Sequence, residues 1–242
     1  MKRTRVGPLA LAATGALVLA LTAPAVDAAR GTGIPTFEQF KASTVRDADG
    51  QYIVNGDEPV AGAGALRSYY EGMVGTATPK ANPAGLVVNT VGGSDDVWPQ
   101  ARVGNLTYCV SNDFGARKNA LVRAAARGTS LWENASTSID FVRVRSADAN
   151  CTTRNGAVVF SIEPTRSQAF IARAFFPSSP DARRNILVNP VSLLTTPDWS
   201  PGNILGHELG HTLGFRHEHT RPEAGICFEN LSWRPLTDYD SA

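Results

Sequence analysis

The chain's four histidines lie within thirteen consecutive residues, and the first three have the spacing of a metal site. In the run His207-Glu208-Leu-Gly-His211 the two histidines stand four residues apart, so on a helix their imidazoles share one face. Imidazole nitrogens bind zinc at about 2.0–2.1 Å, and three protein ligands leave one coordination position for water. Gly214 permits the left-handed backbone that ends a helix, after which the chain reaches His217. These residue types and their spacing predict a three-histidine zinc site.

Glu208 follows the first of these histidines directly, where a carboxylate can take a proton from a water molecule on the metal. The alternative is that His207 and His211 are ordinary residues of a surface helix. His219, two residues beyond the third candidate ligand, is expected to have a solvent-facing or structural role. A base beside an open metal position favours hydrolysis, because a structural zinc site usually has its fourth position filled by protein.

The extended motif H-E-x-x-H-x-x-G-x-x-H resembles that of the metzincin zinc endopeptidases. Its continuation Gly-Phe-Arg-His-Glu-His-Thr-Arg, residues 214–221, is similar to the astacin branch. The run Ala-Arg-Ala-Phe-Phe-Pro, residues 172–177, resembles the substrate-side edge strand of matrixin-like members. Residues 98–242, about 60% of the chain, look most like bacterial secreted metzincins of the myxobacterial protease B type.

The resemblance implies one catalytic Zn²⁺ ion with His207, His211 and His217 as ligands and Glu208 as the general base. In astacins the glutamate after the third histidine receives the N-terminal ammonium group that activation sets free, and Glu218 has this place. The alternative for Glu218 is a solvated surface carboxylate.

The resemblance also implies that a substrate peptide lies extended along the edge strand, pairing with it as an added strand. The substrate-binding residues would then be Ala172, Arg173, Ala174 and Phe175. The alternative is an ordinary edge strand that binds no ligand.

Metzincins carry a methionine in a turn beneath the zinc, downstream of the third histidine. The two methionines of this sequence, Met1 and Met73, both precede the motif. The sequence ends about where the family enters that turn, so the resemblance implies a chain lacking its C-terminal Met-turn region. We expect that Cys227 has lost its partner with that region.

The pattern along residues 98–242 predicts the framework that positions the motif. Content of β-branched and aromatic residues predicts strands over residues 105–110, 139–144, 157–162, 169–176 and 185–189. Apolar spacing predicts a helix over residues 116–133, and Pro201 with Gly202 opens a second helix through Leu213. This order predicts an α+β fold with a mixed sheet and two long helices. The resemblance implies a twisted five-stranded sheet, with the zinc site at the end of the second helix.

Residues 1–28 have the pattern of a secretory signal peptide, with basic residues, an apolar run and then small residues up to Ala28. The apolar run has about 13 residues, shorter than the roughly 20 of a spanning helix. The alternative is an uncleaved membrane anchor. We expect a secreted, extracellular protein with no stable membrane association, a setting that permits disulfides. Cys109 and Cys151 are then candidates to pair, whereas the alternative is that any of the three cysteines is a free buried thiol.

Residues 29–97 are rich in Gly, Ala and Pro and are predicted to be a pro-segment and linker. A strand and a tight turn are expected over residues 52–57 because Asn-Gly favours such turns, and a short helix over residues 66–73. Residues 76–94 are expected to form the linker.

Asp57, in the run Asn55-Gly56-Asp57, faintly resembles the aspartate switch of astacin pro-peptides, in which a carboxylate occupies the water position on zinc. The alternative is an ordinary turn residue. A cysteine switch is excluded, because residues 29–108 contain no cysteine.

Composition narrows the function classes. With 23 basic and 22 acidic side chains, neither sign dominates, so nothing favours a nucleic-acid partner or an acidic lipid surface. A hydrophobic content of 43% is enough for a packed core and excludes disorder as the main description. Together with the motif, the resemblance implies a secreted, zymogenic zinc endopeptidase that is monomeric and acts on protein or peptide substrates. The alternatives are a secreted zinc-binding module without catalytic activity and a zinc hydrolase that acts on other bonds.

Overall fold

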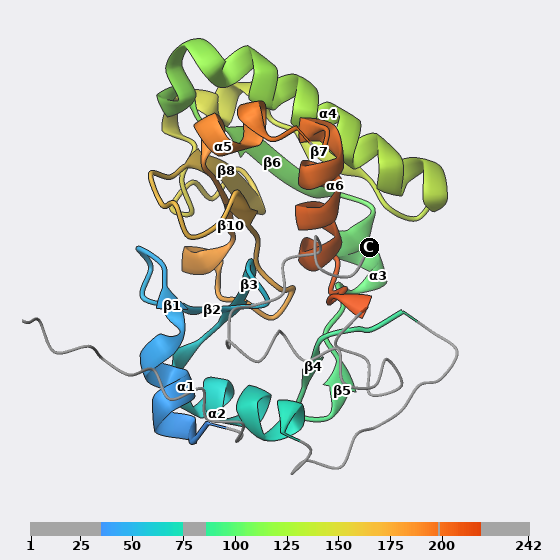
Figure 1. Cartoon of the computed structure of the whole chain (residues 1–242). Coiled ribbons are helices and arrows are strands. Elements are labelled where there is room, and N and C mark those ends of the chain that lie inside the picture. Colours follow the sequence, from blue (N-terminus) through green and yellow to red (C-terminus); the bar gives the residue numbers. More distant parts are fainter. Residues whose placement is uncertain (1–34, 75–85, 198, 219–242) are drawn as a thin grey trace, which may run out of the picture. The chain divides into compact units, whose positions relative to one another are not determined.

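The computed structural model describes residues 35–74, 86–197 and 199–218, all of which belong to one compact unit, Ile34–Ala242. The predicted signal peptide lies outside the described residues, as do His219 and Cys227. The described part contains an α+β body built on a five-stranded sheet, and a smaller N-terminal group of helices and strands (Figure 1).

The sheet of the larger body is mixed, with the strand order β7-β6-β8-β10-β9. Four strands run parallel to their neighbours, and only β9 is antiparallel, pairing with β10 at the edge of the sheet. The α+β prediction with a mixed sheet is confirmed. The strand predicted for residues 169–176 pairs over two residues only. The strands are β6 (Leu106–Val110), β7 (Phe141–Arg143), β8 (Phe160–Pro164), β9 (Ala172–Arg173) and β10 (Asn185–Val188).

Two long helices, α4 (Lys118–Ala135) and α6 (Pro201–Thr212), pack against each other and form the main core together with the sheet (Figure 1). They approach closely, since a Cβ on Gly128 of α4 would lie 2.7 Å from the backbone nitrogen of Gly206 in α6. A larger residue at this crossing would push the helices apart, so the glycines fix where α6 lies. The shorter helical elements are α3 (Gln100–Val103), α5 (Pro190–Thr195) and the 3₁₀ turns η1 (Asn112–Arg117), η2 (Arg145–Asn150) and η3 (Asp181–Arg183).

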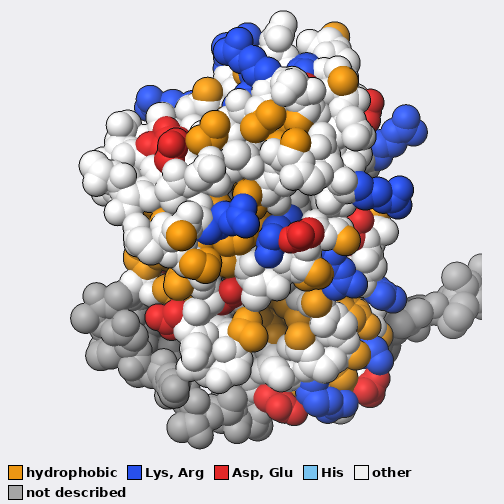
Figure 2. Space-filling model, turned by 180° about the vertical axis from the view of Figure 1, so that it is seen from behind, with side chains coloured by type: hydrophobic (Ala, Val, Ile, Leu, Met, Phe, Trp, Pro, Cys, Tyr) orange, Lys and Arg blue, Asp and Glu red, His pale blue; other side chains and the backbone are white. Residues whose placement is uncertain are grey.

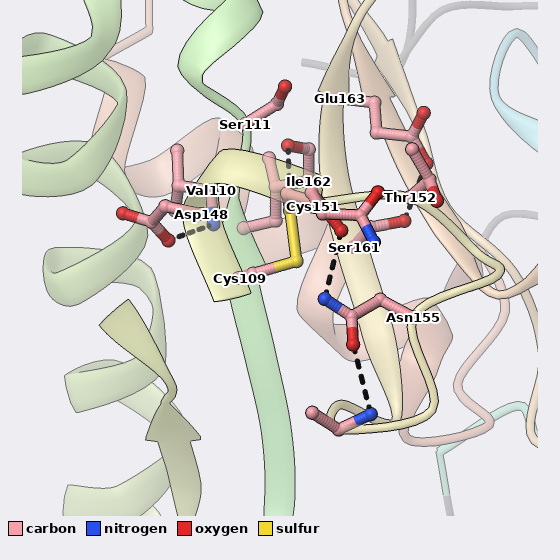
Figure 3. Close-up of a disulfide and its surroundings, with 12 residues drawn as sticks. Cys109, Val110, Ser111, Asp148, Cys151, Thr152, Asn155, Ser161, Ile162 and Glu163 are labelled. Carbon is pink, nitrogen blue, oxygen red and sulfur yellow. Dashed lines mark hydrogen bonds between the residues drawn. A yellow bond between two sulfur atoms is a disulfide. The ribbon is translucent and has the colours of Figure 1, made fainter. Parts of the chain in front are cut away.

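A disulfide joins Cys109 in β6 to Cys151, which follows η2, so the predicted pairing is present (Figure 3). Both cysteines are buried, and the bond closes 42 residues of chain. Beside it, Asp148 of η2 accepts a hydrogen bond from the backbone nitrogen of Val110 at 3.0 Å. The bond therefore ties η2 to β6, an inner strand of the sheet, and closing such a loop restricts the unfolded chain.

The N-terminal group has a hydrophobic cluster of its own, formed by Phe37, Phe40, Tyr52, Val54, Val60 and Leu66. Its strands form an antiparallel sheet in the order β1-β2-β3, and the strand and turn predicted for residues 52–57 are confirmed. The Thr36 hydroxyl and the Gln39 side chain cap the first helix reciprocally. The elements are α1 (Phe37–Ser43), β1 (Val45–Arg46), β2 (Tyr52–Val54), β3 (Glu58–Val60) and α2 (Gly62–Met73).

The described end of the predicted linker contains a short hairpin of β4 (Thr90–Val91) and β5 (Ser94–Asp95). Among the described residues, no helix combines the length and the apolar character needed to cross a membrane. Figure 2 shows basic and acidic side chains scattered over one face of the molecule, with apolar ones between them. This mixture agrees with the nearly balanced charge of the sequence.

Candidate metal centre

Helix α6 places two of the predicted ligands. It begins at Pro201 after Ser200, whose hydroxyl accepts a hydrogen bond from the backbone nitrogen of Asn203 at 3.1 Å. One helical turn separates His207 from His211, and their Nε2 atoms lie 3.2 Å apart. The side chain of His211 is buried, whereas that of His207 is 34% exposed.

The helix ends in a Schellman motif centred on Gly214, which has a φ of 107°. The backbone nitrogen of Gly214 donates to the carbonyl of His211 at 2.9 Å, and that of Phe215 donates to the carbonyl of Gly210 at 3.0 Å. A Cβ at Gly214 would lie 2.3 Å from the backbone oxygen of Asp96. Both the backbone conformation and the space available therefore require glycine, as the motif predicted.

The residues after Gly214 return as an extended segment held by the chain before β4. Phe215 forms an antiparallel bridge with Val88, and the backbone nitrogen of Arg216 donates to the carbonyl of Val87 at 2.8 Å. This pairing carries His217 back to the helix, where its Nε2 lies 3.0 Å from the Nε2 of His207. The three predicted ligands are thus brought together.

Two tryptophans and a backbone carbonyl hold the motif in place. The Nδ1 of His211 lies 2.7 Å from the carbonyl oxygen of Phe215, so Nδ1 donates to that oxygen and Nε2 is the ring nitrogen that faces the other histidines. Trp132 stacks on the Phe215 ring and donates from Nε1 to the carbonyl of Gly206 at 2.7 Å. Trp98 donates in the same way to the carbonyl of Thr212 at 2.6 Å.

Asp57 reaches the three histidines from the N-terminal group. Its Oδ1 lies 3.1 Å from the Nε2 of His217 and 3.4 Å from that of His211, and its Oδ2 lies 3.2 Å from the Nε2 of His207. Burial opposes ionisation of this carboxyl, but hydrogen bonds from the three imidazoles hold the pKa of Asp57 well below its ordinary value. Asp57 therefore faces the site as a carboxylate.

The four side chains bring together donor atoms of the kinds that bind metal ions. Zinc bonds of about 2.0–2.1 Å set neighbouring donor atoms about 3.3 Å apart. The Nε2 atom of His207 lies 3.0 Å from that of His217 and 3.2 Å from that of His211. The oxygens of Asp57 lie 3.1 to 3.4 Å from the three Nε2 atoms. All four ligand atoms lie within 4.8 Å of one another. The cluster can therefore hold a metal ion.

Glu208 is buried and lines a cavity of about 290 Å³ next to the histidines. The cavity lies between the turn that carries Asp57, helix α6 and the chain leading into β9. Its other lining residues include Phe170, Ile171 and Trp199, so its wall is largely apolar. A carboxylate in such a place beside a metal has the position expected of a general base.

Two of the four residues predicted to bind substrate, Ala172 and Arg173, form the edge strand β9, the other two follow it directly, and all four are buried. Ala172 lines the cavity, whereas Arg173 pairs with two carboxylates of the N-terminal group, Asp47 and Asp49. Glu218 is exposed, and its Oε2 accepts a hydrogen bond of 3.4 Å from the backbone nitrogen of Val87.

One buried carboxylate at the site, that of Glu58, was not predicted from the sequence. Glu58, next to Asp57, is fully buried, accepts a hydrogen bond from the backbone nitrogen of His217 at 3.1 Å, and pairs with Arg216. Burial opposes its ionisation, but the charges of Arg216 and His217 lower the pKa of Glu58 to about 2. Only the adjacency of Glu58 to Asp57 and of Arg216 to His217 hinted at this pairing.

No family model matches the chain. The chain is similar to bone morphogenetic protein 1 of Xenopus laevis, with 28% identity over 148 residues. The matched region covers 60% of this chain and 17% of that protein, so the chain spans only a small part of its relative. This similarity supports an astacin-like or metzincin-like relationship at the family level only.

Proposed function

We propose that the chain is the latent form of a secreted zinc endopeptidase. The observation that carries this proposal is the convergence of the Nε2 atoms of His207, His211 and His217 beside buried Glu208. A purely structural site has no need of a carboxylate beside an exchangeable metal position. The distant similarity to bone morphogenetic protein 1 agrees with this assignment.

The three histidines would hold the ion, and His211 is oriented for this by the carbonyl of Phe215. When bound, zinc lowers the pKa of a water ligand to about 7 and polarises a carbonyl group. Glu208 takes the proton from the water that attacks the scissile carbonyl, and it then delivers that proton to the leaving amine. Cleavage of the amide bond therefore consumes one water molecule and leaves Glu208 in its starting form.

Latency is assigned to Asp57, whose carboxylate fills the open face of the histidine site. In this assignment residues 1–28 are the signal peptide, residues 29–97 the pro-segment and linker, and residues 98–242 the protease domain. Removal of the pro-segment withdraws Asp57 and admits water. The substrate then lies along β9. A cut over residues 75–85, within the linker, leaves Val87 near the new N-terminus, and Glu218 receives that terminus because its Oε2 already accepts a hydrogen bond from the backbone nitrogen of Val87.

The test is cleavage of casein by zinc-loaded protein from which the pro-segment has been removed. We expect hydrolysis that a chelator abolishes and that one equivalent of zinc restores. Intact folded protein that binds zinc and leaves casein uncut would favour the zinc-binding module instead. Hydrolysis of an ester or another non-peptide bond without casein cleavage would favour the other class of zinc hydrolase.

A further inference from the structure

The Arg173 guanidinium joins the edge strand to the N-terminal group. Its Nη1 donates to Asn185, at 2.8 Å to the backbone oxygen and at 2.6 Å to Oδ1. Its Nη2 contacts Asp47 Oδ2 at 2.9 Å and Asp49 Oδ2 at 2.5 Å. The Arg173 side chain is fully buried in this arrangement. Nη1 thus binds to a strand of the sheet, whereas Nη2 has its carboxylate partners in the N-terminal group.

The turn between β1 and β2 fixes both carboxylates. Asp47 Oδ1 accepts a hydrogen bond from the backbone nitrogen of Gln51 at 2.9 Å, and the carbonyl of Asp47 accepts one from the nitrogen of Gly50 at 3.1 Å. The side chain of Asp47 is fully buried, and that of Asp49 is 34% exposed. Because the turn is held by its own hydrogen bonds, the carboxylates are preorganised to bind the guanidinium.

The strands next to the ion cluster add an apolar contact. Ile53 of β2 packs with Phe170 and Leu187, both of which belong to the body that carries the histidines. Burial raises the pKa of Glu163 in β8 although the charge of Arg173 acts to lower it, and this side chain already accepts a hydrogen bond from the Ser161 hydroxyl at 2.5 Å. Asp47 and Asp49 therefore supply the carboxylates that contact Nη2 in this form.

We propose that Arg173 is a carboxylate-binding anchor for the pro-segment, which stays bound as a separate inhibitory chain after the connection over residues 75–85 is cut. The binding part follows from the buried ion cluster, and the inhibitory part rests on the proposed protease function. Release of the pro-segment separates the Arg173 guanidinium from two close carboxylates, and losing such charge pairs mainly affects the dissociation rate, so the pairs favour a complex that dissociates slowly. The cluster uses no histidine, and binding therefore persists without the metal and without Asp57.

The test uses the full chain with a recognition sequence for a site-specific protease inserted within residues 75–85. After complete cleavage, gel filtration over a series of dilutions measures how tightly the two pieces hold together, with and without chelator. We expect them to elute together in both conditions and in the Asp57→Ala variant. Asp47→Asn combined with Asp49→Asn keeps the shapes and the acceptor for Gln51 but removes the charges, and should weaken the complex about 30-fold or more.

Glu38→Gln is the matched control, because Glu38 is a carboxylate of the same segment that is 71% exposed. It should leave the dissociation constant unchanged. If the double variant is poorly folded, Asp49→Ala alone decides, since the hydrogen bond between Asp47 and Gln51 stays in place. An affinity equal to that of the parent in these variants, or separation of the parent pieces upon cleavage, overturns the proposal.

Peptide hydrolysis measured on the same fractions separates the two proposals. Both proposals are supported if the parent pieces associate tightly and do not hydrolyse the peptide, whereas the double variant dissociates and does hydrolyse it. Tight association that depends on Asp47 and Asp49, without hydrolysis in any fraction, supports the anchor and contradicts the protease. Hydrolysis with no dependence of binding on these carboxylates supports the protease and contradicts the anchor.

Discussion

The Oδ1 atom of Asp57 lies 3.1 Å from the Nε2 of His217, although the two residues belong to segments at opposite ends of the described chain. Next to this contact, Glu58 accepts a hydrogen bond from the backbone nitrogen of His217. Consecutive carboxylates of the N-terminal group thus bind the side chain and the backbone of one candidate ligand. Displacement of the N-terminal group would therefore remove two contacts to His217, one to its side chain and one to its backbone.

Replacing Asp57 by alanine should change the metal centre of the uncleaved protein. Water takes the place of the carboxylate, so the visible spectrum of the cobalt-substituted protein should shift toward that of the processed protein. Zinc affinity should fall by about tenfold or more, since even the loss of an outer partner of a metal ligand has an effect of that size. Asp181→Asn, at an exposed carboxylate, is the control. Identical spectra for parent and Asp57→Ala protein would show that Asp57 is not a ligand.

Gly214→Ala should destabilise the fold and weaken zinc binding. Alanine tolerates a φ of 107° poorly, and its Cβ would lie 2.3 Å from the backbone oxygen of Asp96. We expect a loss of about 2 kcal/mol or more in the free energy of unfolding, together with displacement of His217. Thermal unfolding and zinc titration measure the two effects. Gly156→Ala, where a Cβ meets nothing within 4 Å, should behave like the parent, and equal results for both variants would contradict the argument.

Asp148 should make stability depend on pH. Its carboxylate contacts Lys118 Nζ at 2.7 Å, the backbone nitrogen of Val110 at 3.0 Å, and Arg143. Burial opposes ionisation, but these hydrogen bonds lower the pKa of Asp148 below its ordinary value. Because an unfolded aspartate has a pKa of about 3.9, the stabilisation is present above that pH and is lost as the pH falls through the folded value.

Asp148→Asn should therefore cost about 1–3 kcal/mol at pH 7 and progressively less below about pH 4. Chemical unfolding of parent and variant over this pH range measures the difference. The exposed Asp181→Asn change serves as the reference and should cost little at any pH. A difference between Asp148→Asn and parent that stays constant with pH would refute the role assigned to the charge.

The local parts of the metal centre could be predicted because they depend on residues close in sequence. The i, i+4 spacing of His207 and His211, and the glycine that ends their helix, follow from helix geometry alone. The N-terminal turn was likewise predictable from Asn55 and Gly56, and both have the positive φ that such turns need. The mixed sheet followed from the order of strand and helix patterns.

The remaining contacts could not be predicted, because they join segments far apart in the chain. Residues 87–89 fall in the predicted linker, yet they pair with residues 214–216 and set the path to His217. The carboxylates that pair with Arg173 lie in a turn, and the sequence of that turn predicts polar residues but not their partner. Composition shows a balance of charge but not which arginine meets which carboxylate, so the ion pairs emerge only from the fold.

The most direct test of the central claim is the rate of quenched-peptide hydrolysis by processed parent protein and by its Glu208→Ala variant, with bound zinc measured in both. Removing the base while the three histidines remain should lower the rate by at least about 100-fold, with zinc content unchanged. Asp181→Asn, which alters an exposed carboxylate away from the metal motif, should keep most of the hydrolysis. A Glu208→Ala protein that binds zinc and hydrolyses the peptide at the parent rate would contradict the account.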